Sequence, residues 1–308
     1  MIITALVPIF ILILLGFLIS RTTLVSTAMW PELERLTYYF FFPALLILRL
    51  AASNFDWQDI REIAQVVGLA IFGMTLFVFI VRKLIASDPS SLSSVYQGSI
   101  RFNTYIGLAC IDALYGDRGL TTAALCLAVY IPLVNVLSVI SLSLHGNGGP
   151  NRWANIFSST LSNPLVLACV VGVGISYTGY QIPDLAESVV SLLTLPALPL
   201  GLLAVGAGIQ FTALGTQGWQ LMAAVFNKML LFPALTLGAC LLFDTGTALA
   251  TILIILSVLP APPSAFILAR QLGGNVSLMA NIITVQTIVA FVAIPFWLQM
   301  SDRYLSLY

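Results

Sequence analysis

The sequence predicts an all-α polytopic membrane protein, and three observations carry this prediction. Of the 308 residues, 59% are hydrophobic and 8% are charged, whereas a soluble domain carries about 25% charged residues. The apolar residues lie in runs long enough to cross a bilayer, which takes about 20 residues. Short connections rich in Gly, Pro, Asn and Asp separate these runs. Lipid is therefore the solvent that fits this chain.

Ten apolar segments meet the length criterion, and we expect each to form a transmembrane helix. The first segment lacks the basic stretch and the small-residue cleavage site of a signal peptide, so we expect it to remain as a span. The approximate ranges are 2–20, 34–53, 62–85, 93–115, 119–143, 159–179, 187–210, 219–242, 248–271 and 277–300.

The two halves of the chain resemble each other weakly, which indicates an internal repeat. A shift of 156 residues lays Gly16 on Gly172, and a shift of about 159 lays "RFNTYIG" on "APPSAF". Five spans per half is an odd number, so the second half enters the membrane from the opposite side, as in many secondary transporters. We expect a first five-helix repeat over 1–145, a linker over 146–157 and an inverted repeat over 158–308.

Two corresponding spans, the fourth and the ninth, carry signals of interruption. Pro260, Pro262 and Pro263 remove three backbone donors within four residues of the ninth span, and each disfavours helical geometry in the residue before it. In the fourth span, Asn103 and Thr104 compete for backbone hydrogen bonds and form helices poorly. Both spans are therefore predicted to break. Irregular backbone at this depth survives only beside a cavity or inside protein, so we expect the breaks to lie in such a place.

Broken helices expose peptide N–H groups at half-helix N-termini, which favour an anion. Side chains at both breaks then orient that ligand, and an arginine pairs with a carboxylate through two nitrogens. Arg101 serves either as this ligand or gate, or as a structural cation. The predicted substrate-binding residues are Arg101, Asn103, Thr104, Tyr105, Pro262, Pro263 and Ser264.

The segments "RFNTYIGLACIDALYGDRGL", "SNPLVLACVVGVGIS" and "LPAPPSAFILARQLGGNVSLMA" resemble the auxin efflux carrier family. This family holds plant hormone exporters and their bacterial relatives, in a superfamily like the bile acid/sodium symporters. Asn103-Thr104-Tyr105 matches the end of the plant pattern Asn-Pro-Asn-X-Tyr, while Arg101 and Phe102 replace its Asn-Pro. The resemblance implies two inverted five-helix repeats with crossed, broken helices four and nine. It also implies a scaffold domain, a transport domain and carriage of small organic anions.

Four further polar residues within the spans are candidates for coupling or gating. Asp112 either couples transport to a cation or is solvated near the outer end of its helix. Lys228 either reaches the transport cavity or extends its stem to the membrane surface, and the second reading is favoured. Asn163 and Gln286 either contribute to a cation or substrate site or join helices by hydrogen bonds.

Together these features predict a secondary transporter that moves a small organic anion, auxin-like or another carboxylate, by alternating access of an elevator type. A sodium- or proton-coupled symporter, a channel and a non-transporting receptor or scaffold are the alternatives. The sequence lacks the HExxH, GxSxG and P-loop motifs, so we expect no enzyme. We expect no cofactor apart from coupling to Na⁺ or H⁺, and no metal site.

The expected partners are the substrate anion and the lipid bilayer. With 12 basic and 12 acidic residues the formal charge is zero, so no nucleic-acid partner is expected. A homodimer is left open. The short loops favour a bacterial inner membrane, and a weak excess of arginine and lysine on one side places both termini outside. The cysteines, Cys110, Cys126, Cys169 and Cys240, lie in apolar runs and are expected to be buried.

Overall fold

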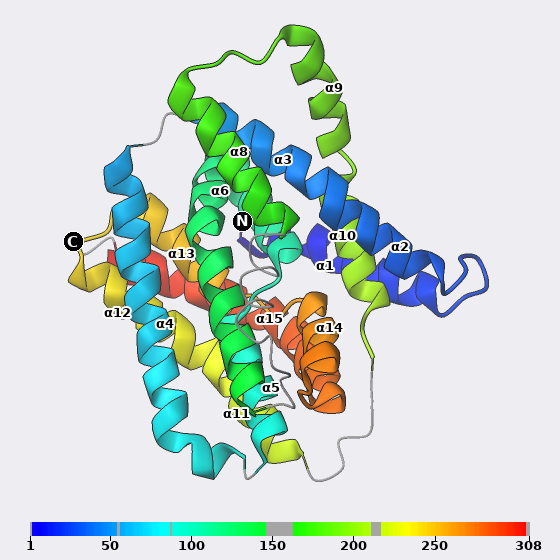
Figure 1. The fold of residues 1–308 in the computed structure, drawn as a ribbon, viewed down its shortest axis with the longest axis vertical. Coiled ribbons are helices and arrows are strands. Elements are labelled where there is room, and N and C mark those ends of the chain that lie inside the picture. Colours follow the sequence, from blue (N-terminus) through cyan, green and yellow to red (C-terminus); the bar gives the residue numbers. More distant parts are fainter. Residues whose placement is uncertain (1, 54–55, 87, 146–162, 211–216, 306–308) are drawn as a thin grey trace.

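The computed structural model describes residues 2–53, 56–86, 88–145, 163–210 and 217–305, and their regular structure is entirely helical (Figure 1). The predicted linker 146–157 and the start of the sixth predicted span lie outside the described residues. The first-half helices are α1 (Ile2–Ser20), α2 (Met29–Leu36), η1 (Thr37–Phe41), α3 (Phe42–Ala51), α4 (Trp57–Ile85), α5 (Pro89–Ile100) and α6 (Thr104–His145). The second-half helices are α8 (Pro164–Thr178), α9 (Asp184–Thr194), α10 (Ala197–Ala207), α11 (Gly218–Phe226), η2 (Asn227–Leu231), α12 (Phe232–Leu242), α13 (Thr247–Val258), α14 (Pro263–Leu272) and α15 (Val276–Leu305).

The protein is an all-α polytopic membrane protein. In the described part of the chain, six helical stretches are long and apolar enough to cross a bilayer, and a seventh is the pair α13 and α14, which is bent by 52°. One stretch, Pro89–Ser143, covers two of the predicted spans, because Gly116 turns the chain at φ 58° and ψ −150°. The count of ten spans stays a prediction.

Two π-helical turns, η1 and η2, interrupt otherwise α-helical stretches, and the sequence analysis did not predict them. Each is followed at once by Phe-Pro-Ala-Leu, with Pro43 and Pro233 as the second residue of the next helix. Proline has no N–H to close an α-helical turn, and its ring displaces the carbonyl four residues earlier. The wider π turn accommodates this displacement.

Two close helix pairs, α1 with α10 and α3 with α8, depend on glycine. A Cβ at Gly16 of α1 would lie 2.1 Å from the carbonyl oxygen of Leu203, and one at Gly172 of α8 would lie 2.7 Å from the Cβ of Leu50. Small residues let helix backbones approach in this way inside membranes. Gly16 and Gly172 are the glycines that the shift of 156 residues superimposes.

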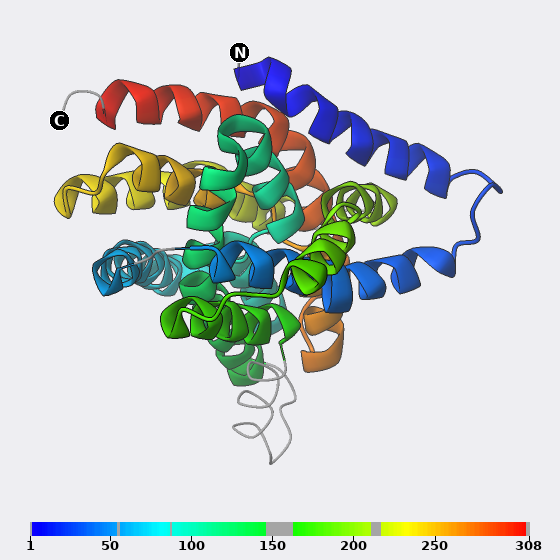
Figure 2. The ribbon, with the colours of Figure 1, turned by 90° about the horizontal axis from the view of Figure 1, so that it is seen from above.

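These two pairs form one group of helices, and α4, α5 and α11 to α15 form another. Helix α6 packs against both groups, contacting α1, α3, α8 and α10 as well as α4, α5, α13 and α14. In Figure 2, α1 and α15 run along the same edge of the molecule, where Phe10 packs edge-to-face on Phe291. An ion pair of 2.6 Å joins Arg49 of α3 to Asp117 beside the Gly116 turn.

Candidate functional site

Both predicted interruptions are present, and they touch each other. Helix α5 ends at Ile100 and α6 begins at Thr104, while α13 ends at Val258 and α14 begins at Pro263. The peptide nitrogen of Asn103 donates a 2.7 Å hydrogen bond to the carbonyl oxygen of Pro260, so the two non-helical segments cross in contact. The helices that resume, α6 and α14, start 159 residues apart.

Local sequence explains each break. At the first, the Oδ1 atom of Asn103 accepts hydrogen bonds from the peptide nitrogens of Tyr105 (2.9 Å) and Ile106 (3.3 Å), which caps α6. At the second, Pro262 holds an extended conformation (φ −81°, ψ 155°) and Pro263 is the first residue of α14. Proline at that position lacks a donor that the helix does not need.

The side chain of Gln286 on α15 forms hydrogen bonds with backbone groups at both breaks. Its Oε1 accepts from the peptide nitrogen of Ala261 (2.9 Å). Its Nε2 donates to the carbonyl oxygens of Gly98 (2.9 Å) and Ala224 (3.0 Å). Gln286 is fully buried, so the structure favours the reading of this residue as an interhelical bridge.

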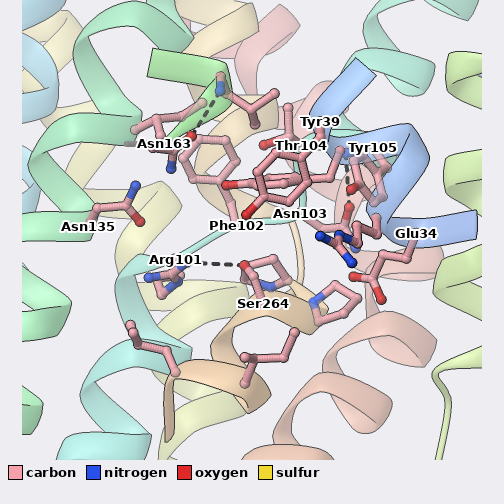
Figure 3. A pocket seen from close by; sticks show the side chains of 18 of the residues that line it. Glu34, Tyr39, Arg101, Phe102, Asn103, Thr104, Tyr105, Asn135, Asn163 and Ser264 are labelled. Atoms are coloured by element: carbon pink, nitrogen blue, oxygen red, sulfur yellow. Dashed lines mark hydrogen bonds between the residues drawn. The ribbon is translucent and has the colours of Figure 1, made fainter. Parts of the chain in front are cut away.

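A cavity of about 610 Å³ lies at the crossing, and residues of α2, η1, α6, α8 and α14 line it (Figure 3). Figure 3 shows Arg101, Asn135 and Asn163 toward the left of the view and Glu34 and Tyr39 toward the right. Its lining comprises Pro31, Glu32, Glu34, Arg35, Tyr38, Tyr39, Arg101, Phe102, Asn103, Thr104, Tyr105, Ile131, Val134, Asn135, Val139, Asn163, Leu165, Pro262, Pro263, Ser264, Ile267, Leu268 and Gln271.

Arg101 is the buried cation of this cavity. It is 8% exposed, and its Nη2 donates to the Oγ of Ser264 (3.1 Å). Its Nε has no hydrogen-bond partner among the residues that the structure describes. Tyr38 lies within electrostatic reach of both Arg101 and Glu34 and close to Asn163. The guanidinium therefore keeps unused donor capacity beside the open space.

Much of the wall is apolar or aromatic. The rings of Phe42 and Tyr105 stack at 4.5 Å, and Phe102 packs edge-to-face on Tyr130, also at 4.5 Å. Tyr105 and Phe102 both line the cavity. A cavity with one enclosed cation, several amides and an apolar body suits a ligand that has an anionic head and an apolar tail.

Eight of the residues singled out in the sequence line this one cavity, namely Arg101, Asn103, Thr104, Tyr105, Asn163, Pro262, Pro263 and Ser264. Asn163 also caps α8, because its Oδ1 accepts from the peptide nitrogens of Leu165 and Val166.

Three candidates lie elsewhere. Asp112 is partly exposed and sits in the electrostatic neighbourhood of Arg49 and Asp117. Gln286 contacts the backbone at the breaks but does not line the cavity. Extension of Lys228 to the membrane surface is wrong, because the side chain is 0% exposed and its Nζ lies 4.8 Å from the centroid of the Phe232 ring. The η2 turn directs it into the protein.

Several polar residues of the lining were not predicted, and Glu34 and Asn135 are two of them. Each was visible as a polar side chain in a predicted span, which marks a functional candidate by default. Glu34 is the first residue of the predicted span 34–53, a position where a charge is ordinarily solvated. Helix α2 begins five residues earlier, at Met29.

A family model described as "Membrane transport protein" matches residues 1–151 and 153–298. The chain belongs to this family. The match covers nearly the whole chain and confirms its membership of the auxin efflux carrier group. No curated protein matches it significantly. The protein is therefore a membrane transporter.

Proposed function

We propose that this transporter is a secondary carrier that moves a small organic anion by alternating access, with the anion held in the cavity between the two breaks. The observation that carries the proposal is the buried Arg101, whose Nε is unpaired in the described structure and whose neighbours line an open cavity. A carboxylate supplies the acceptor oxygens that this guanidinium lacks.

Two helix N-termini reinforce the preference for an anion. Helices α6 and α14 begin at Thr104 and Pro263, and both residues line the cavity. The N-terminal end of a helix carries about half a positive charge. An anion between them gains from both ends without a further charged side chain.

The apolar wall indicates the rest of the substrate. Tyr39, Phe102 and Tyr105 offer ring surfaces, and Ile131 and Val134 offer aliphatic surface. Such a wall favours a carboxylate with an aromatic or branched body over a small, fully hydrated anion. Auxin-like carboxylates belong to this class.

The paired contacts support a repeated architecture of ten helices in two inverted halves. Gly16 and Gly172, superimposed by the shift of 156 residues, each serve a close helix pair, and the two breaks resume 159 residues apart. An inverted repeat provides two halves that exchange inward-open and outward-open forms. Movement of one helix group against the other then exposes the cavity to each side of the membrane in turn, in an elevator manner.

We place the protein in a bacterial inner membrane with both termini outside.

The test is uptake of radiolabelled carboxylates into liposomes that contain the purified protein. The panel comprises acetate, butyrate, benzoate and indole-3-acetate, each measured with and without sodium and proton gradients. We expect saturable uptake, strongest for benzoate or indole-3-acetate. Uptake that does not saturate would indicate a channel, and binding without flux would indicate a receptor; either result overturns the carrier proposal.

A further inference from the structure

Lys228 lies in an enclosure formed with Phe102, Tyr130 and Phe232. The Nζ atom is 4.8 Å from the centroid of the Phe232 ring and 5.9 Å from that of Phe102. The Tyr130 ring packs on both phenylalanines. All four side chains are buried, and within the described residues neither the Lys228 Nζ nor the Tyr130 hydroxyl has a hydrogen-bond partner.

The neighbours of Lys228 hold it inside. The Nδ2 of Asn227 donates to the Oγ of Ser99 on α5 (3.1 Å). The carbonyl oxygen of Met229 accepts from the Nε1 of Trp297 on α15 (2.7 Å). The η2 turn is therefore attached to other helices on both sides of Lys228.

No carboxylate balances a charge on Lys228 in the described structure. Helices α5, α11, α12 and α13 contain no Asp or Glu. The carboxylates of α6, Asp112 and Asp117, lie in the neighbourhood of Arg49, and Asp302 of α15 lies in that of Tyr115. Tyr130 packs on the two phenylalanine rings that Lys228 contacts, Cys126 of α6 lies next to Tyr130, and Cys240 of α12 lies next to Cys126. Glu62 of α4 lies in the neighbourhood of Cys240, and the hydroxyl of Tyr96 on α5 is hydrogen-bonded to Thr75. Arg101 precedes Phe102 in the first break.

An ammonium ion in this enclosure loses its hydration without gaining a counter-charge. The two ring contacts offset part of that loss. A neutral amine carries no such penalty. Lysines in such surroundings change protonation state readily.

The enclosure adjoins the cavity through Phe102. This residue lines the cavity and also faces Lys228, and the preceding residue is Arg101. An anion bound at Arg101 therefore places negative charge beside the residue that precedes Phe102, whose ring faces the amine. Binding of the anion and binding of a proton then favour each other, and this coupling acts equally in both directions.

We infer that Lys228 is the proton-carrying group of this transporter. The amine takes one proton from water on the side where the anion enters and becomes an ammonium ion. It returns that proton to water on the other side when the anion leaves. With a monocarboxylate the cycle moves one proton and one anion together and transfers no net charge. This inference rests on the proposed function and adds the coupling ion to it.

The test uses liposomes that contain the purified transporter and a trapped pH-sensitive dye, with radiolabelled indole-3-acetate or benzoate outside. After subtraction of the signal from protein-free liposomes, we expect a proton gradient to drive accumulation of the label by the unmodified protein, and uptake to acidify the lumen by one proton per anion. Lys228→Met keeps the length of the side chain but binds no proton. It is expected to retain exchange of internal unlabelled for external labelled anion and to lose both accumulation and acidification.

Lys228→Arg stays charged and is expected to show the same loss of proton dependence. The control is Lys83→Met, since Lys83 is the other lysine of the sequence and is exposed at the end of α4. It is expected to behave like the unmodified protein.

Three results overturn the inference. These are accumulation by Lys228→Met in response to a proton gradient, loss of exchange by a folded Lys228→Met, and saturable uptake without proton movement by the unmodified protein. The last result needs no variant, so it decides the matter even if both substitutions prevent folding. Absence of saturable uptake of every carboxylate would instead overturn the proposed function itself.

Discussion

The peptide nitrogen of Asn103 donates a 2.7 Å hydrogen bond to the carbonyl oxygen of Pro260, and this bond ties the two broken helical segments together. Every break in a helix leaves N–H and C=O groups without intrahelical partners. Here the N–H of the first break pairs with a C=O of the second. The Gln286 side chain pairs with the N–H of Ala261 and with the C=O of Gly98. Irregular backbone is thus made tolerable inside the membrane.

Replacement of Asn103 by alanine is predicted to abolish anion uptake while the protein stays folded. The side chain caps α6 through Tyr105 and Ile106, and loss of such a cap costs about 1 kcal/mol. That loss lowers Tm slightly but leaves the first break without its fixed shape. Initial uptake rates and thermal unfolding in detergent measure the two effects.

Asn275→Ala is the matched control, because Asn275 lies away from the cavity and its Oδ1 accepts from the peptide nitrogen of Leu278 near the start of α15. We expect a similar fall in Tm with uptake retained. Equal loss of uptake in both variants would mean that Asn103 acts through stability alone.

Substitution of Arg101 is predicted to weaken binding of the anion. Arg101→Lys keeps the charge but loses the planar fork, so KM is expected to rise about tenfold, the equivalent of about 1.4 kcal/mol. Arg101→Gln removes the charge and is expected to abolish saturable uptake. Concentration dependence of uptake measures both. Arg270→Lys, at an exposed position near the end of α14, is the control, and a KM unchanged in Arg101→Lys would contradict the assignment.

The close contact between α1 and α10 predicts opposite outcomes for two glycines. A Cβ at Gly16 would meet the backbone carbonyl of Leu203, whereas nothing lies within 4 Å of one at Gly68 in α4. Gly16→Ala is expected to destabilise the protein by about 1–3 kcal/mol through overpacking. Gly68→Ala is expected to be neutral or to stabilise by up to about 1 kcal/mol, since alanine favours helix. A lower Tm for Gly68→Ala than for Gly16→Ala would be inconsistent with this packing.

The positions of the breaks were predictable because their causes are local. Three prolines within four residues and an asparagine before Thr104 act on their own backbone, and the breaks fall at those residues. The convergence of both breaks was predicted because a shift of about 159 residues lays one segment on the other. The sequence therefore indicated the lining residues at the two breaks.

The placement of Lys228 was not predictable in the same way. Its direction depends on the η2 turn, and the turn depends on Pro233 five residues later and on the contacts of Asn227 and Met229 with other helices. Periodicity along one helix carries no information about these neighbours. Glu34 and Asn135 were missed for a related reason, because only tertiary packing brings α2 and the second half of α6 to the crossing.

The thermal stability of a Gln286 variant distinguishes a role as an interhelical bridge from a role as a cation ligand. Gln286→Leu leaves the carbonyls of Gly98 and Ala224 and the N–H of Ala261 buried without their partner. Each such group costs about 1–3 kcal/mol, so a large fall in Tm is expected at every sodium concentration. Gln58→Leu, at an exposed position in the first turn of α4, is the control and is expected to leave Tm unchanged. A cation site predicts a different pattern, in which sodium raises Tm of the unmodified protein and Gln286→Leu loses that response while staying folded.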